Sequence, residues 1–283
     1  MRGKVEIVRD GRLLAGAAYL FCRENGVRIP GLDKPAADVR LRLAAEGAAD
    51  EKGRLIDPAF GYACYEYYRQ THAPDYFDKL LLREAEGRRR ILDLCCGAGA
   101  TVKALLGRGP DLIYAVDSDE RQIGLLAAIV QASEAARGKV SVHTADAHRL
   151  PIGRHAVDYV VCRTALHYLD PQRALAEAYR VLSPGGKLFL LVHGTGYRWH
   201  YLVIRNGIFR RKTAAYLLRK LLGRPRGGQP GTGLSAVQAR YLTWRELEKS
   251  LLAAGFDKIS FHTSPRWMVA GRFPVYFAAV AEK

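Results

Sequence analysis

The sequence predicts an α/β fold in which a mostly parallel sheet is covered by helices on both faces. From Arg88 onward, short apolar segments of strand length alternate with segments of helical length, and turn-forming residues separate them. Strands that alternate with helices in this way are typical of a parallel sheet. About half of the 283 residues are hydrophobic, which is enough for one large domain with additions or for two small domains.

Residues 1–60 are predicted to form an N-terminal extension that caps the main domain. Alternating apolar residues at 5–8 and an aromatic patch at 18–21 predict short strands there. A turn is predicted at 26–31. A short helix is predicted at 38–46.

The main domain is predicted to span residues 61–283. It begins with a tyrosine-rich segment and a helical run to Glu86. Strands are predicted at 91–94, 112–116, 140–144, 157–162, 187–192, 258–261 and 275–280. Helices are predicted from Thr101, at 120–136, at 172–182, and between a capping box of Thr243 with Glu246 and a closing Gly255. A basic helical insertion at 194–240 interrupts the alternation.

The net charge of +16 favours anionic partners, such as nucleic acid, a membrane surface or an acidic small molecule. The charge is unevenly distributed, because residues 194–226 contain nine Lys or Arg residues and no Asp or Glu. No signal-peptide run follows Met1, and no apolar run reaches the ~18 residues that span a bilayer. We therefore expect a cytoplasmic protein, with membrane association through the basic segment as an open alternative.

The segment ILDLCCGAGA at 91–100 places two adjacent cysteines at the turn between the first strand and the first helix. The five cysteines include no C-x-x-C pair, so neither a disulfide framework nor a metal site is predicted. Adjacent side chains on an extended backbone point in opposite directions, which does not suit one shared metal ion. We interpret Cys95 and Cys96 as supports of a ligand pocket, one facing the pocket and one the sheet. A thiol nucleophile is the alternative.

Three aspartates stand at the ends of three successive strands, where an open α/β sheet binds its ligands. Asp93 precedes Gly97 and Gly99, which allow the backbone a close approach to a ligand. Asp117 can accept from both ribose hydroxyls of a nucleoside, and Asp146 can accept from an adenine amino group. The third glycine of the dinucleotide fingerprint G-x-G-x-x-G is missing, which disfavours a nicotinamide cofactor. The pattern predicts an adenosine cofactor that carries a positive charge.

The chain resembles the class I S-adenosylmethionine-dependent methyltransferases. Five segments are similar to the family's motifs, in order: 92–99, 115–117, 145–151, 157–161 and 180–187. The resemblance covers roughly residues 90–193, resumes at 241–283 and is closest to the branch of ubiquinone/menaquinone biosynthesis methyltransferases. Cys95 replaces a glycine that is usual in the family, a variant that occurs within that branch. The resemblance implies a Rossmann-like, seven-stranded, mostly parallel sheet.

The resemblance also implies the cofactor, S-adenosylmethionine, and the residues that hold it. We expect no metal ion. The candidate cofactor-binding residues are Asp93, Cys95, Gly97, Gly99, Asp117, Ser118, Asp146, Ala147 and Arg163.

Methyl transfer from a sulfonium requires alignment of donor and acceptor and the exclusion of water, and it requires a base only where the acceptor keeps its proton. The acceptor pocket is expected after the fourth and fifth strands, beside the N-terminal extension. His167 and His193 are the candidate catalytic bases, each with a structural role as the alternative. The candidate acceptor-binding residues are Tyr62, Tyr76, Tyr168, Tyr197, Trp199 and His200.

The basic insertion leaves the acceptor class open. Apolar and basic residues interleave between Tyr201 and Leu222, which is typical of amphipathic helices. Such helices can form a lid, lie at a membrane interface or follow the backbone of RNA. We expect a small acceptor, hydrophobic or anionic and of secondary-metabolite, quinone or lipid-like character, methylated on O, C or N. An RNA methyltransferase, a nicotinamide-dependent reductase and a non-catalytic membrane adaptor are the alternatives, and the oligomeric state is not predicted.

Overall fold

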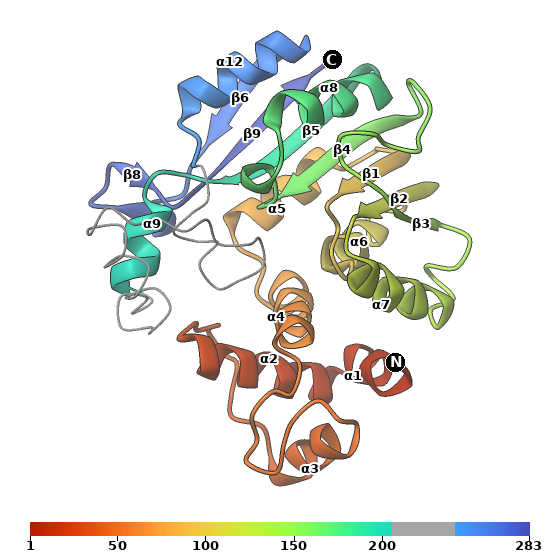
Figure 1. Ribbon diagram of the computed structural model, residues 1–283, viewed down its shortest axis with the longest axis vertical. Coiled ribbons are helices and arrows are strands. Elements are labelled where there is room, and N and C mark those ends of the chain that lie inside the picture. Colours follow the sequence, from red (N-terminus) through yellow and green to blue (C-terminus); the bar gives the residue numbers. More distant parts are fainter. Residues whose placement is uncertain (205–240) are drawn as a thin grey trace, which may run out of the picture.

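The computed structural model describes residues 1–204 and 241–283, and it confirms the predicted Rossmann-like α/β architecture (Figure 1). The main sheet has seven strands in the order β3-β2-β1-β4-β5-β9-β6. Strands β1 to β5 are parallel, and β9 runs antiparallel to both of its neighbours. The strands are β1 (Arg90–Leu94), β2 (Leu112–Asp117), β3 (Val140–Thr144), β4 (Val157–Arg163), β5 (Leu182–His193), β6 (Asp257–His262) and β9 (Tyr276–Glu282).

Helices cover both faces of the sheet, because successive residues of each strand enter opposite cores. On β5, Leu188 and Leu190 belong to one core, and Phe189 belongs to the other. Helices α8 (Pro171–Val181) and α12 (Trp244–Ala254) cover the first face. Helices α5 (Tyr76–Glu84), α6 (Ala100–Leu106) and α7 (Glu120–Gln131) cover the second. The capping box and the left-handed Gly255 that bound α12 are confirmed.

The N-terminal extension is helical, and the strands predicted at 5–8 and 18–21 are wrong. The chain forms α1 (Arg2–Arg9), α2 (Gly11–Asn25) and α3 (Ala37–Ala45), the last of which confirms the helix predicted at 38–46. Both misassigned segments are short windows cut from longer helical patterns, in which local alternation is a weak signal. In α2 the side chain of Asp10 caps the first turn and Gly26 ends the helix in the left-handed conformation.

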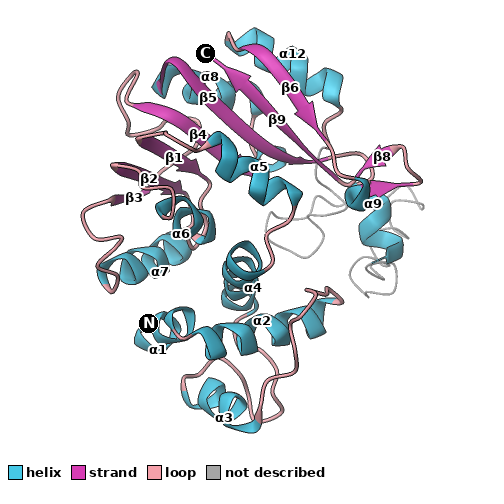
Figure 2. Cartoon of the chain, turned by 180° about the vertical axis from the view of Figure 1, so that it is seen from behind, coloured by secondary structure: helices cyan, strands magenta, loops and turns pink. Residues whose placement is uncertain are grey.

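Helix α4 (Pro58–His72) joins the extension to the sheet domain (Figure 2). Its buried residues share one apolar core with α1, α2 and α3, and that core also includes Ala98, Ala100 and Leu125 from the sheet domain. The domain boundary predicted between residues 60 and 61 therefore lies within α4. The hydroxyl of Tyr67 donates to the carbonyl of Ala98 at 2.6 Å, which ties α4 to the loop after β1.

The strand order reverses between β1 and β4, and ligands of open α/β sheets bind at the carboxyl ends of strands next to such a reversal. After β5 the chain forms α9 (Tyr197–Trp199) and a π-helical turn (His200–Ile204). The short strands β7 (Met268–Val269) and β8 (Phe273–Pro274) pair in a small separate hairpin. None of the helices that the structure describes is both long and apolar enough to cross a membrane. The amphipathic helices predicted between Tyr201 and Leu222 lie largely outside the described residues.

Candidate functional site

A cavity of about 650 Å³ lies at the carboxyl ends of β1, β2, β4 and β5, beside α4. This volume is within the ~300–1,000 Å³ that is usual for small-molecule sites. The wall has two parts. A polar, acid-rich part comes from α4, β1 and β2, and an aromatic part comes from the segments after β4 and β5 and before β9.

The loop after β1 forms one side of the polar part. Gly97 and Gly99 have positive φ angles of 53° and 87°. The φ of Gly99 favours glycine, and a Cβ atom there would also lie 2.3 Å from the end of the Leu126 side chain. No atom of the described residues lies within 4 Å of the place where a Cβ of Gly97 would stand, and Gly97 lines the cavity. The backbone at Gly97 is therefore open to close approach by a ligand.

Asp93, near the end of β1, is a buried carboxylate with an unsatisfied oxygen. The residue is 1% exposed, and its Oδ2 has no hydrogen-bond partner among the described residues. Burial raises the pKa of Asp93 to about 7; Arg163 opposes this rise and Asp117 adds to it. A buried carboxylate without a partner is costly, so its position in a cavity wall indicates a ligand that carries a positive group.

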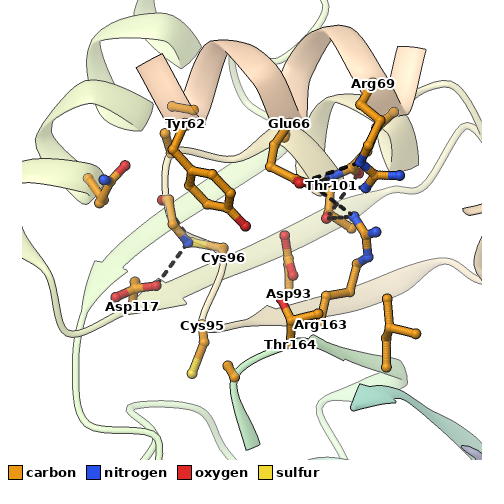
Figure 3. Close-up of a pocket in the computed structure, with 18 of the residues that line it drawn as sticks. Tyr62, Glu66, Arg69, Asp93, Cys95, Cys96, Thr101, Asp117, Arg163 and Thr164 are labelled. Atoms are coloured by element: carbon orange, nitrogen blue, oxygen red, sulfur yellow. Dashed lines mark hydrogen bonds and ion pairs between the residues drawn. The ribbon is translucent and has the colours of Figure 1, made fainter. Parts of the chain in front are cut away.

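Arg163, at the end of β4, is a largely buried side chain whose Nε atom is buried and unsatisfied. Its guanidinium donates to Asp78 at 2.8 Å and to the hydroxyl of Thr101 at 3.3 Å. Its Nε has no partner among the described residues. Both Arg163 and Asp93 line the cavity, close to Tyr62 and Glu66 of α4 (Figure 3). The wall thus offers one carboxylate oxygen and one N–H donor within the same region.

An ion-pair network between α4, α5 and β4 holds Arg163 in place. Arg69 pairs with Glu66 at 2.9 Å and with Asp78, which also binds Arg163. Burial alone would raise the pKa of Asp78, but Arg163 and Arg69 hold that pKa below its usual value. The same two arginines lower the pKa of Glu66 against the effect of burial. Two carboxylates therefore balance the two guanidinium groups.

Asp117 connects the end of β2 to the loop after β1. Its Oδ2 accepts from the backbone N–H of Gly97 at 2.8 Å, and its Oδ1 accepts from that of Asp119 at 2.9 Å. Asp117 and Ser118 both line the cavity. A carboxylate has about four lone-pair sites, so both oxygens of Asp117 keep acceptor capacity for a ligand.

Asp146 and Ala147 lie outside the described wall of this cavity. The Asp146 side chain is 61% exposed and its Oδ1 lies 2.6 Å from Nδ1 of His148, whose backbone N–H it also accepts. Ala147 is buried in the core beneath α8. The contact of these two residues with an adenine ring stays a prediction.

Cys95 and Cys96 both line the cavity, and they pack toward opposite faces of the sheet. A hydrogen bond with Cys162, together with burial, raises the pKa of the Cys95 thiol. Burial, and then Asp93, raises the pKa of Cys96. Raised pKa values disfavour the thiolate, so the surroundings favour a structural role over a nucleophile.

The aromatic part of the wall surrounds His193 at the end of β5. The rings of His193 and Tyr197 stack with centroids 3.9 Å apart, and Tyr276 lies 5.1 Å from His193. Trp267 stands perpendicular to Tyr276 at 4.9 Å, and its Nε1 donates to Asp75 at 3.2 Å. This bond joins the segment before β9 to the start of α5.

Two glycines allow the close packing that sets the position of Tyr197. The backbone N–H groups of Gly194 and Gly196 donate to the carbonyls of Val275 and Pro274, at 3.0 and 2.9 Å. A Cβ atom on Gly194 would lie 2.3 Å from the carbonyl oxygen of Pro274. The chain after β5 therefore needs glycine here to lie against the segment that carries Tyr276.

The two candidate bases occupy different positions. His193 is 9% exposed and lines the cavity, whereas His167 lies outside its described wall, with its ring 4.2 Å from that of His193. Burial lowers the pKa of His167 to about 4, and neither of its ring nitrogens has a hydrogen-bond partner among the described residues. Such a group is a weak base at neutral pH. His193 is the better placed candidate, and both catalytic roles stay predictions.

The candidate acceptor-binding residues divide into two groups. Tyr62, Tyr168 and Tyr197 line the cavity, whereas Tyr76, Trp199 and His200 do not belong to its described wall. The sequence analysis missed several wall residues, chiefly from α4, α5 and the segment before β9: Tyr65, Glu66, Arg69, Gln70, Asp75, Phe77, Thr101, Gln122, Trp267 and Tyr276. The spacing of three and four along α4 could have placed its members on one face of a helix.

Comparison with known proteins shows which proteins this chain resembles. Residues 92–190 match the family model described as a methyltransferase domain. An uncharacterized methyltransferase of Mycobacterium bovis is 36% identical over 140 residues, which are 49% of this chain and 53% of that protein. The chain spans about half the length of the first curated relatives it matches.

Solved structures share the fold. The structure of an S-adenosylmethionine-dependent methyltransferase from Mesorhizobium loti has a TM-score of 0.51 and 19% identity, over 72% of this chain and 95% of that one. Phosphoethanolamine N-methyltransferase 2 of Haemonchus contortus, solved with S-adenosyl-L-methionine, has a TM-score of 0.55 and 16% identity, over 77% and 56%. The chain therefore shares the fold of these solved methyltransferases, and the family match lies within that fold at residues 92–190.

Proposed function

We propose that this chain is a class I methyltransferase that uses S-adenosylmethionine to methylate a small acceptor. The observation that supports this most strongly is the pair of unsatisfied buried atoms in the cavity, Oδ2 of Asp93 and Nε of Arg163. A carboxylate and an N–H donor together complement the ammonium and carboxylate of an amino acid, which forms one end of this cofactor. The cofactor thus fits the polar atoms that the described protein leaves without partners.

Other residues of the cavity suit the remainder of the cofactor. Asp117 keeps acceptor capacity for ribose hydroxyls, and Gly97 leaves the backbone open to a ligand. When bound, S-adenosylmethionine supplies a methyl group activated by a sulfonium. The aromatic part of the wall would hold the acceptor next to that group and keep water out, which is the main requirement of such a transfer.

The acceptor is part of the proposal. The cavity has the size of a small-molecule site, and its described wall holds five carboxylates against two arginines. This balance would repel an RNA phosphate inside the cavity, which supports a small acceptor there. Similarity to the ubiquinone/menaquinone branch supports methylation on O, C or N of a hydrophobic molecule. Contact with a membrane through residues 194–226 rests on charge alone, because most of that segment is outside the described residues.

The test uses cofactor with a labelled methyl group, incubated with the protein and a host extract. Label in the organic phase supports a small hydrophobic acceptor, and label in RNA refutes it. The Asp93→Asn variant should lose transfer, whereas Asp111→Asn, at the opposite end of the sheet in an exposed ion pair with Arg89, should retain it. If Asp93→Asn transfers label like the natural protein, the assignment of the amino-acid end is wrong.

A further inference from the structure

We infer that the acceptor is an uncharged, planar aromatic molecule that is methylated on a hydroxyl group held beside His193. The inference rests on the proposed function and names the substrate class of the same site. It follows from two properties of the described wall. Aromatic side chains form its acceptor end, and its arginines are paired with carboxylates.

The first property is the density of aromatic rings. Tyr197 and Tyr276 lie 5.6 Å apart and nearly perpendicular at 72°, and both lie against His193. Trp267 continues this wall through its perpendicular contact with Tyr276, and Tyr168 lines the cavity from the segment after β4. Ring faces and edges at such angles interact best with another ring, through stacked and edge-to-face contacts that a saturated molecule cannot form.

The rings are fixed rather than adaptable. The nitrogen of the Trp267 indole is bound to Asp75, and Tyr276 is the first residue of β9, in register with His193 on β5. The backbone N–H of Tyr197 donates to the carbonyl of Gly194 at 3.0 Å, and the N–H of Gly194 in turn donates to the carbonyl of Val275. A wall of preformed flat surfaces selects a flat ligand, because no ordering of side chains is needed when it binds.

The second property is charge compensation. The described wall contains two arginines and no lysine, and Arg69 and Arg163 are each paired with carboxylates. Asp75 accepts from Trp267 and lies 3.9 Å from Arg69. An acceptor carboxylate would therefore have no unpaired cation among the described wall residues. An ammonium would have to compete with the cofactor for Asp93 and Asp117, or with existing partners for the other carboxylates. An uncharged ring avoids both costs.

A hydroxyl on that ring gives a balanced reaction. The hydroxyl oxygen attached to the ring loses its proton to the imidazole of His193 and donates an electron pair to the methyl carbon. The bond between that carbon and sulfur breaks, and its electron pair stays on sulfur as a neutral thioether. The protein ends with a protonated His193, which returns the proton to solvent when the products leave.

The test compares three probes of similar size in the presence of saturating S-adenosylhomocysteine: 2-naphthol, 6-hydroxy-2-naphthoate and decahydro-2-naphthol. We expect 2-naphthol to bind at least about tenfold more tightly than the other two in calorimetric titration, and to accept labelled methyl groups. Equal or tighter binding of the carboxylate or of the saturated alcohol would overturn the inference. Binding of S-adenosylhomocysteine is measured first. If the protein does not bind it, the proposed function is wrong, and the acceptor class is not the cause of the failure.

Matched variants locate the probe. Tyr276→Leu removes a ring and should weaken 2-naphthol binding about three- to tenfold, whereas Tyr276→Phe keeps the ring and should bind normally. Affinity for S-adenosylhomocysteine should not change in either, and Trp267→Leu replaces Tyr276→Leu if that variant does not fold. Trp244→Leu, whose ring stacks on Phe261 away from the cavity, is the control. Equal 2-naphthol affinity in the leucine variants and the control would refute the aromatic site.

Discussion

Replacement of Asp93 by asparagine should make the cofactor-free protein more stable at pH 8 while it removes cofactor binding. The carboxylate is buried and its Oδ2 has no partner among the described residues. Its ionised form is therefore destabilising until a ligand with a positive group is bound. An asparagine of the same shape avoids the charge but does not offer a carboxylate to that ligand.

The pKa of Asp93 gives the size and the sign of the effect. Burial raises this pKa to about 7, against about 3.9 in an unfolded chain. Between these values the folded protein keeps a proton that the unfolded chain has released, so stability from this group falls as the pH rises. At ~1.4 kcal/mol per pKa unit, the ionised group costs roughly 4 kcal/mol above pH 7 and about 1.5 kcal/mol at pH 5.

The asparagine amide leaves a neutral group unsatisfied, which costs about 1–3 kcal/mol and offsets part of the gain. The expected net gain in the free energy of unfolding is thus about 1–3 kcal/mol at pH 8 and close to zero or negative at pH 5. Urea unfolding of Asp93→Asn and the natural protein at both pH values measures it. Asp111→Asn, an exposed residue in a surface ion pair, is the control and should change stability little. A loss of stability of Asp93→Asn at pH 8 would refute the reasoning.

Other predictions follow from single contacts. Asp117→Ala should weaken S-adenosylhomocysteine binding by at least about tenfold, because two hydrogen bonds to ribose are lost, and unchanged affinity in calorimetry would refute the ribose assignment. Gly194→Ala should lower the free energy of unfolding by about 1–3 kcal/mol, since its Cβ meets the Pro274 carbonyl; equal melting temperatures would contradict this. Tyr67→Phe should cost about 1 kcal/mol through loss of its buried bond to Ala98, and urea unfolding with no shift in midpoint would count against it.

The sheet was predictable because the alternation of strand-length and helix-length segments is local and is repeated along the chain. Most of the seven strands are apolar runs bounded by turn residues, and the edge strands β3 and β6 alternate apolar with polar residues. The strand predicted at 187–192 was too short at its start, since β5 begins at Leu182. The N-terminal strands were mispredicted because apolar residues in α1 and α2 are frequent enough to alternate over four positions by chance. Only the longer pattern, with its caps at Asp10 and Gly26, distinguishes a helix from a strand.

The cavity was predictable where its residues follow strands and not where they come from elsewhere. Asp93, Asp117 and Arg163 stand at strand ends, which the fold brings together at one edge of the sheet. Trp267 and Glu66 reach the same cavity from the segment before β9 and from α4, and their neighbourhood depends on packing between elements far apart in the sequence. The difference between His167 and His193 likewise depends on which ring faces the cavity, a property without a sequence signal.

The most direct measurement compares two ligands that share an adenosine and differ in the amino-acid end. S-adenosylhomocysteine carries that end and 5′-methylthioadenosine lacks it, so their affinities report on Asp93 and Arg163 directly. Calorimetric titration at pH 8 should show S-adenosylhomocysteine binding at least about tenfold more tightly, with most of the difference lost in Asp93→Asn. Equal affinities, or no binding of S-adenosylhomocysteine, would contradict the proposed cofactor site.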